Sequence, residues 1–255
     1  MDGEVRLEVA EGLAELVLDR PAKLNAVTPA MAAAIAEHAR RIDAERAIRA
    51  VLLRGAGPRA FCAGSDLNAL AAYPDAWSFR SRVAYEAAIR GIRKPVVAAL
   101  KGWTLGGGAE MALASDLRIA ARSTRVGFPE VTRGWVGGGG ASQLLPRLIG
   151  YGAAMRLLLT GEPVDAEEAL RLGLVDQLVE DGAEEEVARA LCRKLAGFSP
   201  VAVQAVKAAV RQALEAPLSA GLAYENEMNV LCFAAGDHHE GIRAFVEKRD
   251  PAFKR

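Results

Sequence analysis

The chain is organised around the segment Leu105-Gly106-Gly107-Gly108-Ala109-Glu110-Met111-Ala112-Leu113-Ala114. The apolar run 95–100 before it predicts a buried strand, and the Ala/Met/Leu-rich half of the segment predicts a helix. Glycines at the start of that helix leave backbone N–H groups open to a ligand, and the helix dipole adds partial positive charge there. The segment therefore predicts a strand, a tight turn and a helix whose N-terminus can bind an anion or stabilise a developing negative charge.

The glycine turn has a rival interpretation, because a strand, a glycine turn and a helix also form dinucleotide and phosphate loops. In the dinucleotide fingerprint the third glycine would fall at position 111, which is Met111. No Gly-Lys-Ser or Gly-Lys-Thr occurs anywhere in the chain. The spacing argues against nucleotide phosphates on this turn and leaves anion stabilisation as its predicted use.

Two carboxylates accompany this turn. Glu110 lies in the first turn of the predicted helix, and Glu130 follows in Phe128-Pro129-Glu130, just before the glycine run Gly137–Gly140. Taken singly, each glutamate also fits a charge that complements a helix dipole, and Pro129 suits the first position of a helix. Taken together with the anion site, the pair predicts acid and base catalysis beside a carbonyl group.

Other catalytic systems lack their residues. Neither Ser65 nor Ser142 has the flanking glycines of a nucleophile elbow, and three histidines without a His-Glu-x-x-His motif leave little for metal or Ser-His-Asp chemistry. Cys62, Cys192 and Cys232 show no C-x-x-C spacing, so neither a disulfide framework nor a thiolate metal site is expected. We expect no metal ion, and catalysis that depends on carboxylates and backbone amides.

The composition describes an ordinary globular chain of 255 residues, 51% hydrophobic and 25% charged. Its 32 basic and 32 acidic residues cancel, so bulk charge favours neither a nucleic acid nor an anionic membrane as partner. The acidic start, residues 1–4, has neither the basic nor the apolar part of a signal peptide, and no apolar run approaches the ~18–20 residues that span a membrane. We expect a cytoplasmic protein with no membrane and no nucleic-acid partner.

Hydrophobic patterning predicts a body of β-β-α units followed by helices. The predicted strands are 5–9, 13–18, 49–54, 95–100, 116–120 and 124–128, and the predicted helices of the body begin at Thr28-Pro29 or cover 73–92 and 107–114. Later helices are predicted over 184–195 and from Ser199-Pro200, where a serine and a proline form a typical helix start. We expect residues 1–182 to form the core with the active site and residues 183–255 to form a helical region.

Short motifs along essentially the whole chain resemble the crotonase superfamily, the enoyl-CoA hydratase/isomerase family. The matching pieces are Asp19-Arg20-Pro21 with Leu24-Asn25-Ala26, Phe61-x-Ala63-Gly64-x-Asp66-Leu67, Gly106-Gly107-Gly108-x-Glu110 with Asp116, Phe128-Pro129-Glu130, Gly137–Gly140 with Gln143, Thr160-Gly161, Ala169 with Gly173-Leu174-Val175, and Phe245-x-Glu247-Lys248-Arg249. The resemblance implies an α/β fold, a crotonase-like spiral of β-β-α repeats whose C-terminal helical region, residues 183–255, packs a trimer. It implies a homotrimer or a dimer of trimers.

The resemblance also implies a site for an acyl-CoA thioester. The backbone N–H groups of Ser65 and Gly107 would form an oxyanion hole, in which the loss of one donor costs ~2.7–4 kcal/mol. Glu110 and Glu130 stand where hydratases of the family keep two glutamates, which implies syn addition of water to a trans-2-enoyl-CoA to give a 3-hydroxyacyl-CoA. We expect Glu110 to activate the water and Glu130 to give a proton to the α-carbon.

The coenzyme A contacts are carried over from the same resemblance. They are Lys23, Leu24, Arg59, Ala63, Ser65, Asp66, Leu67 and Lys248, the last from a neighbouring subunit. For Arg59 or Lys248 alone, a solvated surface charge is an equally good interpretation. No separate cofactor is expected, because coenzyme A is part of the substrate. The chain departs from the family at Asn68, where a basic residue is common, and at Trp135-Val136-Gly137, where a proline is common.

Two other functions stay open. An enoyl-CoA isomerase, or a dehydratase of a specialised acyl-CoA, would use the same oxyanion hole. A non-catalytic acyl-CoA-binding or RNA-binding member would use the fold alone, but the neutral net charge and the two glutamates favour the hydratase. The length and branching of the acyl chain are not indicated, although aromatic residues are candidates for its wall as well as for the core: Tyr73, Trp103, Trp135 and Phe253.

Overall fold

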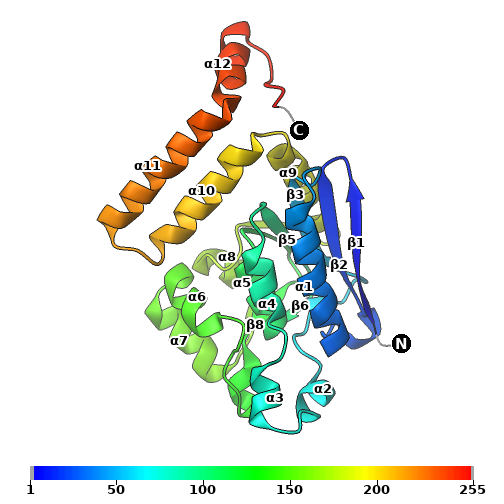
Figure 1. Cartoon of the computed structure of the whole chain (residues 1–255). Helices are drawn as coiled ribbons and strands as arrows, with labels where there is room; N and C mark the ends of the chain where they lie inside the picture. The colour runs from blue at the N-terminus through cyan, green and yellow to red at the C-terminus, as the bar shows by residue number, and fades with distance from the viewer. Residues whose placement is uncertain (1–2, 254–255) are drawn as a thin grey trace.

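The computed structural model describes residues 3–253, which form two β-sheets surrounded by helices (Figure 1). The larger sheet has the order β1 (Glu4–Ala10), β2 (Leu13–Asp19), β3 (Ala50–Gly55), β5 (Val96–Leu100), β7 (Leu117–Ala121) and β10 (Gln177–Val179). The smaller sheet has the order β4 (Ala60–Cys62), β6 (Trp103–Leu105), β8 (Arg125–Gly127) and β9 (Val164–Asp165). The antiparallel pair β1 and β2 is the predicted hairpin, and the larger sheet is parallel from β2 onward.

Helices occupy the connections and the C-terminal part. They are α1 (Pro29–Ala44), α2 (Leu67–Ala71), α3 (Ala76–Arg80), α4 (Tyr85–Gly91), α5 (Gly107–Ala114), α6 (Ala141–Ile149), α7 (Tyr151–Thr160), α8 (Ala166–Leu172), α9 (Glu184–Ala196), α10 (Pro200–Ala213), α11 (Leu218–Ala235) and α12 (Asp237–Glu247), with short 3-10 helices η1 (Pro21–Lys23) and η2 (Pro129–Arg133). The predicted starts of α1 and α10 are confirmed, because Thr28 and Ser199 each accept a hydrogen bond from the backbone three residues later at 3.2 Å.

The chain alternates between the two sheets. β3 is followed by β4, β5 by β6 and β7 by β8, so each turn adds one strand to each sheet. Parallel neighbours need a crossover connection, and helices such as α4 and α5 lie in these connections. This alternation confirms the predicted repeat of two strands and a helix.

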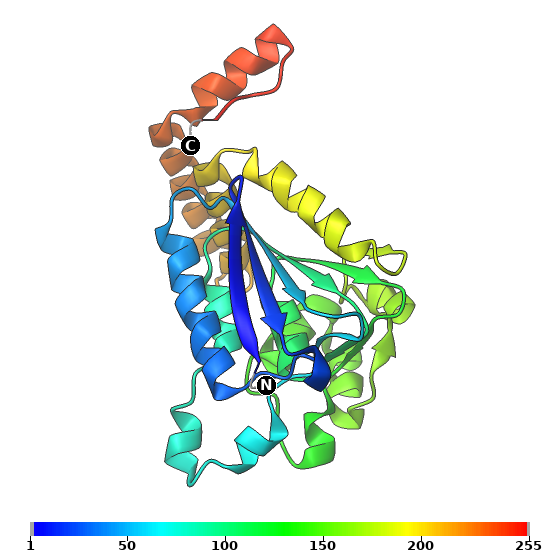
Figure 2. The ribbon, with the colours of Figure 1, turned by 90° about the vertical axis from the view of Figure 1, so that its right-hand side faces the viewer.

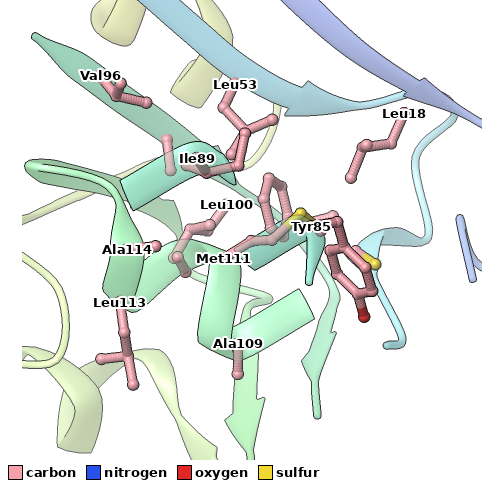
Figure 3. Close-up of a cluster of buried hydrophobic side chains, with 14 of the residues drawn as sticks. Leu18, Leu53, Tyr85, Ile89, Val96, Leu100, Ala109, Met111, Leu113 and Ala114 are labelled. Carbon is pink, nitrogen blue, oxygen red and sulfur yellow. The ribbon is translucent and has the colours of Figure 1, made fainter. Parts of the chain in front are cut away.

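Both faces of the larger sheet are buried, which explains the uninterrupted apolar runs of its central strands. On β3, Leu53 faces one hydrophobic cluster, whereas its neighbour Leu52 faces a second cluster that includes residues of α9. Figure 2 shows the sheet between α1 and α9. Figure 3 shows the first cluster, to which α4 and α5 contribute Ile89 and Met111. The core therefore holds α5, and with it the glycine turn, firmly against the strands.

The prediction of one helix over 73–92 is wrong, because the structure has α3 and α4 with an irregular link between them. Asp75 accepts a hydrogen bond from Ser78 N (2.7 Å) and precedes the first residue of α3, whose last residue is Arg80. The apolar positions of the two parts point to different surroundings, since Ile89 is buried whereas Trp77 is 74% exposed. Because the chain is not helical between α3 and α4, residues of this link can line the pocket described below.

Helices α11 and α12 extend away from the sheets, whereas α10 lies between α11 and the body, with Lys207 and Arg211 paired to Asp116 (Figure 1). α9 packs against β3, β5 and β7, whereas α10 packs against α11 and α12 follows α11. α11 buries none of its residues, and its large exposed apolar side chains are Leu218, Leu222, Val230, Leu231 and Phe233. The division into a core over 1–182 and a trimerisation region over 183–255 stays a prediction. Within the second of these regions, α9 lies on the larger sheet. Among the described helices, none has both the length and the apolar character that crossing a bilayer requires.

Candidate active site

A pocket of about 780 Å³ lies beside the N-terminus of α5. Its walls come from the loop after β2, the segment after β4, the link before α4, the start of α5 and the segment that follows β8. β4 and β6 are parallel neighbours, so the segments that leave their carboxyl ends meet at one edge of the smaller sheet. The predicted residues Ser65, Gly107, Glu110 and Glu130 all line this pocket.

Ser65 and Gly107 bring two backbone amides to the pocket. A Cβ atom on Gly64 would lie 3.1 Å from Gly107 N, which shows how closely the two segments approach. Within residues 3–253, no oxygen accepts a hydrogen bond from the amide of either Ser65 or Gly107. A side chain at Gly107 would collide with the Tyr85 hydroxyl, so only glycine fits. Two amides without protein acceptors at one pocket can bind an oxyanion.

The Ser65 hydroxyl is occupied by a separate contact. Its Oγ lies 2.9 Å from the Tyr85 hydroxyl, and the Tyr85 ring belongs to the buried cluster (Figure 3). Burial raises the pKa of the Tyr85 hydroxyl well above its ordinary value, so this group stays protonated. The geometry fits a serine that acts through its backbone N–H rather than through its side chain.

Glu110 is 2% exposed and is held by the second glycine run. Its Oε1 accepts hydrogen bonds from Gly139 N (2.8 Å) and Ala141 N (3.0 Å), where α6 begins. A Cβ on Gly139 would lie 2.7 Å from Glu110 Oε2 and 2.5 Å from Glu86 Cγ, so this glycine leaves room for two carboxyl groups. The run 137–140 therefore fixes one carboxylate oxygen while the residue still lines the pocket.

Glu130 lies in η2 directly after Pro129, as predicted. Its Oε2 is buried and has no hydrogen-bond partner among the described residues. Burial raises the pKa of Glu130; a backbone hydrogen bond and Arg133 oppose the rise, whereas the charge of Glu110 adds to it. A carboxyl group that holds its proton more strongly than usual suits proton transfer to carbon.

Glu86 is a third glutamate of the pocket, and its place was not predicted. It is 7% exposed, and burial raises its pKa to about 7, with Glu110 adding to the rise while a backbone hydrogen bond, the Tyr85 hydroxyl and Arg82 oppose it. A Cβ on Gly107 would lie 2.9 Å from Glu86 Oε1, which places this carboxyl beside the two amides. Its position three residues before the buried Ile89, on the apolar face of α4, is the feature of the sequence that could have indicated its burial.

The predicted coenzyme A residues divide into two groups. Those that line the pocket are Lys23, Leu24, Ala63, Ser65, Asp66 and Leu67, and those that do not are Arg59 and Lys248. Asp66 also has a structural task, because it forms an ion pair with Arg20 (2.6 Å) and accepts hydrogen bonds from the first amides of α2. Lys248 directly follows α12, which lies at the opposite end of the molecule from α2 and α3 (Figure 1). A role for Lys248 in this site needs a second subunit and stays a prediction.

Aromatic rings form one wall of the pocket. The ring centroids of Tyr73 and Phe79 lie 5.5 Å apart, and those of Phe79 and Trp135 lie 5.2 Å apart. Tyr73 and Trp135 were candidates for the acyl wall, and both line the pocket, whereas Trp103 and Phe253 do not. The wall is therefore built by α3, the segment before it and the segment after η2.

Comparison with known proteins identifies the family. The model of the enoyl-CoA hydratase/isomerase family matches residues 8–255. The chain is 36% identical to (E)-benzylidenesuccinyl-CoA hydratase of Thauera aromatica over 98% of both chains, and 38% identical to 2,3-dehydroadipyl-CoA hydratase of Escherichia coli over 94% of both. The crystal structure of an enoyl-CoA hydratase from Bacillus anthracis matches with a TM-score of 0.93 at 34% identity, covering 98% of both chains, which confirms the predicted crotonase-like fold. The chain belongs to the enoyl-CoA hydratase/isomerase family.

Proposed function

We propose that this protein is an enoyl-CoA hydratase, a hydro-lyase that adds water in syn fashion to a trans-2-enoyl-CoA and forms a 3-hydroxyacyl-CoA. The observation that carries the proposal is the meeting of Glu110, Glu130 and the amides of Ser65 and Gly107 at one pocket. Relatives named as hydratases of acyl-CoA thioesters, 36% and 38% identical over nearly the full chain, support the same activity.

The two amides stabilise the thioester oxygen during the reaction. When water adds to the β-carbon, electrons move from the double bond toward the thioester carbonyl, and the carbonyl oxygen gains negative charge. Amides that are already aligned stabilise this charge without reorganising, and one such donor is typically worth ~2.7–4 kcal/mol of the barrier. The contacts around Ser65 and Gly107 supply two donors of this kind.

The two glutamates divide the proton transfers. Glu110 accepts a proton from the water whose oxygen bonds to the β-carbon, and Glu130 gives a proton to the α-carbon, which converts the enolate into the 3-hydroxyacyl thioester. Proton exchange with solvent then returns each carboxyl group to its starting state. The pKa of Glu130, raised by burial, supports its role as donor, and the two amides that hold Glu110 keep its carboxylate in one orientation.

Substrate binding and assembly complete the proposal. The loop at Lys23 and Leu24 and the segment 63–67 bind the coenzyme A part of the substrate, and no separate cofactor is involved. Arg59 and Lys248 meet its phosphates, Lys248 across a subunit contact. A homotrimer or a dimer of trimers in the cytoplasm covers the apolar side chains exposed on α11.

The test is incubation of the purified protein with trans-2-enoyl-CoA substrates of several chain lengths, beginning with crotonyl-CoA. Loss of the absorbance of the conjugated thioester, with 3-hydroxyacyl-CoA as product, is the expected result. Migration of the double bond without hydration would support the isomerase instead. A folded protein without turnover that binds RNA in a salt-dependent manner would support the non-catalytic alternative.

A further inference from the structure

The pocket contains an arginine whose charge the proposed reaction does not use. Arg82 lies in the link before α4 and lines the pocket. The Cζ of Arg82 lies 4.0 Å from the centroid of the Phe79 ring, and Nη1 donates a hydrogen bond to the Phe79 carbonyl oxygen (2.9 Å). A Cβ on Gly138 would lie 2.5 Å from Nη2, so another side of the guanidinium faces the glycine run. These contacts hold the charge in a defined place on the pocket wall.

No carboxylate among the described residues forms an ion pair with Arg82. Other partly buried arginines of this molecule are paired, as Arg20 is with Asp66 at 2.6 Å and Arg54 with Glu15 at 2.8 Å. A guanidinium carries five N–H donors, and within residues 3–253 only Nη1 of Arg82 has an acceptor. The remaining donors and the full charge suit an anionic group of a ligand.

The guanidinium lies close to the segment that holds Glu110. Gly138, which Nη2 of Arg82 approaches, directly precedes Gly139, whose N–H holds Glu110. The residue that Arg82 approaches is therefore one Cα–Cα step, ~3.8 Å, from the residue whose amide fixes the carboxylate assigned to water. Since the proposed reaction places the β-carbon at Glu110, an acyl group that continues beyond the β-carbon reaches toward Arg82.

We infer that Arg82 binds a second carboxylate carried by the acyl group, so that the pocket selects enoyl-CoA thioesters of dicarboxylic acids over those of unsubstituted fatty acids. The inference rests on the proposed function, because that function determines where the thioester lies. A guanidinium held by an aromatic ring and a carbonyl presents a planar pair of N–H donors that matches the two oxygens of a carboxylate.

The acidic groups nearby are compatible with this assignment. The groups that face Glu86 are Tyr85, Arg82, Glu110 and Cys62. Because burial raises the pKa of Glu86 to about 7, this carboxyl is mostly protonated below that pH and adds little negative charge beside Arg82. Above it, ionised Glu86 competes for the guanidinium, so the preference for a carboxylated acyl group should weaken as the pH rises.

The experiment compares two saturated thioesters that cannot be hydrated, adipyl-CoA and hexanoyl-CoA, which have acyl chains of equal length. Their dissociation constants are measured by calorimetry at pH 6 for the wild type, Arg82→Gln, Arg82→Lys and the control Arg80→Gln. Arg80 is exposed at the end of α3 and does not line the pocket, so its replacement removes the same charge nearby. Hydration of crotonyl-CoA and of 2,3-dehydroadipyl-CoA is measured in parallel and tests the proposed function separately.

The wild type is expected to bind adipyl-CoA at least ~10-fold more tightly than hexanoyl-CoA, as is typical for a hydrogen bond to a charged group. Arg82→Gln should remove most of this preference and leave the affinity for hexanoyl-CoA nearly unchanged. Arg82→Lys should retain part of the preference, and Arg80→Gln should retain all of it.

Equal affinities for the two thioesters in the wild type would overturn the inference. Equal weakening of both ligands in Arg82→Gln would overturn it too, because the arginine would then contact coenzyme A or only support the link. A retained adipyl preference without hydration of either enoyl-CoA would overturn the hydratase but keep the carboxylate site.

Discussion

The pocket and helix α11 depart from the ordinary placement of polar and apolar groups in opposite directions. In the pocket, carboxyl groups are buried: Glu86 and Glu110 are 7% and 2% exposed, and Glu130 Oε2 has no partner among the described residues. On α11, apolar groups are exposed, with Leu218 at 78% and Phe233 at 70%. Both arrangements are unfavourable for an isolated chain, so each indicates a use. The comparison suggests chemistry at the first region and assembly at the second.

The largest effect is expected from removing the charge of either carboxylate to which the proposed reaction assigns a proton transfer. Glu110→Gln and Glu130→Gln should each lower crotonyl-CoA hydration by ~10²–10⁴-fold, the range typical of general acid and base catalysis. Steady-state turnover is measured, with circular dichroism to confirm the fold. Glu167→Gln is the matched control, because Glu167 also lies in the first turn of a helix but outside the pocket. Full activity in Glu110→Gln or Glu130→Gln would reduce that residue to a charge at a helix start.

The next effect concerns the oxyanion hole. Ser65→Pro removes an amide donor and should lower turnover by at least ~10²–10³-fold, whereas Ser65→Ala keeps the amide and should retain most activity. Turnover of crotonyl-CoA by both folded variants is compared with the wild type. If Ser65→Ala is as inactive as the proline variant, the serine hydroxyl takes part in the chemistry and the assignment to the backbone is wrong.

Burial of Glu86 should appear in the pH dependence of stability. Its pKa is about 7 in the fold against an ordinary value of 4.5, so the folded chain binds this proton more tightly than the unfolded chain does. The contribution of Glu86 to the free energy of unfolding is therefore highest below about pH 4.5 and falls by up to ~3 kcal/mol as the pH rises to about 7. Glu86→Gln has no proton to lose and should have a higher Tm than the wild type at pH 8 but a similar one at pH 4. An equal difference at both pH values would contradict the proposed burial of an ionisable group.

The smallest effect on catalysis is expected from α11. Leu218→Glu combined with Leu222→Glu should convert a trimer or hexamer into smaller species, because it places charge on apolar side chains that assembly would cover. Light scattering measures the mass, with Glu225→Gln on the same helix as control. Crotonyl-CoA turnover should change less than in the preceding variants, since the pocket described above is built by one chain. A wild type that is monomeric at micromolar concentration would contradict assembly and the cross-subunit role of Lys248.

The sequence was informative where local patterns carry the structure. The glycine turn before α5 predicted where Gly107 and Glu110 lie, and a serine or threonine before a proline marked the starts of α1 and α10. Arg82 and Glu86 could not be placed, because the break of the predicted helix over 73–92 depends on tertiary contacts. A buried carboxyl such as Glu86 also carries no motif, and its pKa is raised chiefly by burial in the folded chain, to which the charge of Glu110, distant in sequence, adds.

The central claim is that Glu110 acts on water and Glu130 acts on carbon beside one oxyanion hole. It is tested most directly by deuterium incorporation at the α-carbon of saturated butyryl-CoA, a reaction that needs the oxyanion hole and the carboxylate at carbon but no attacking water. Glu130→Gln is predicted to lose this exchange together with hydration, whereas Glu110→Gln is predicted to lose hydration and retain most of the exchange. Equal loss of exchange in the two folded variants would contradict the division of roles.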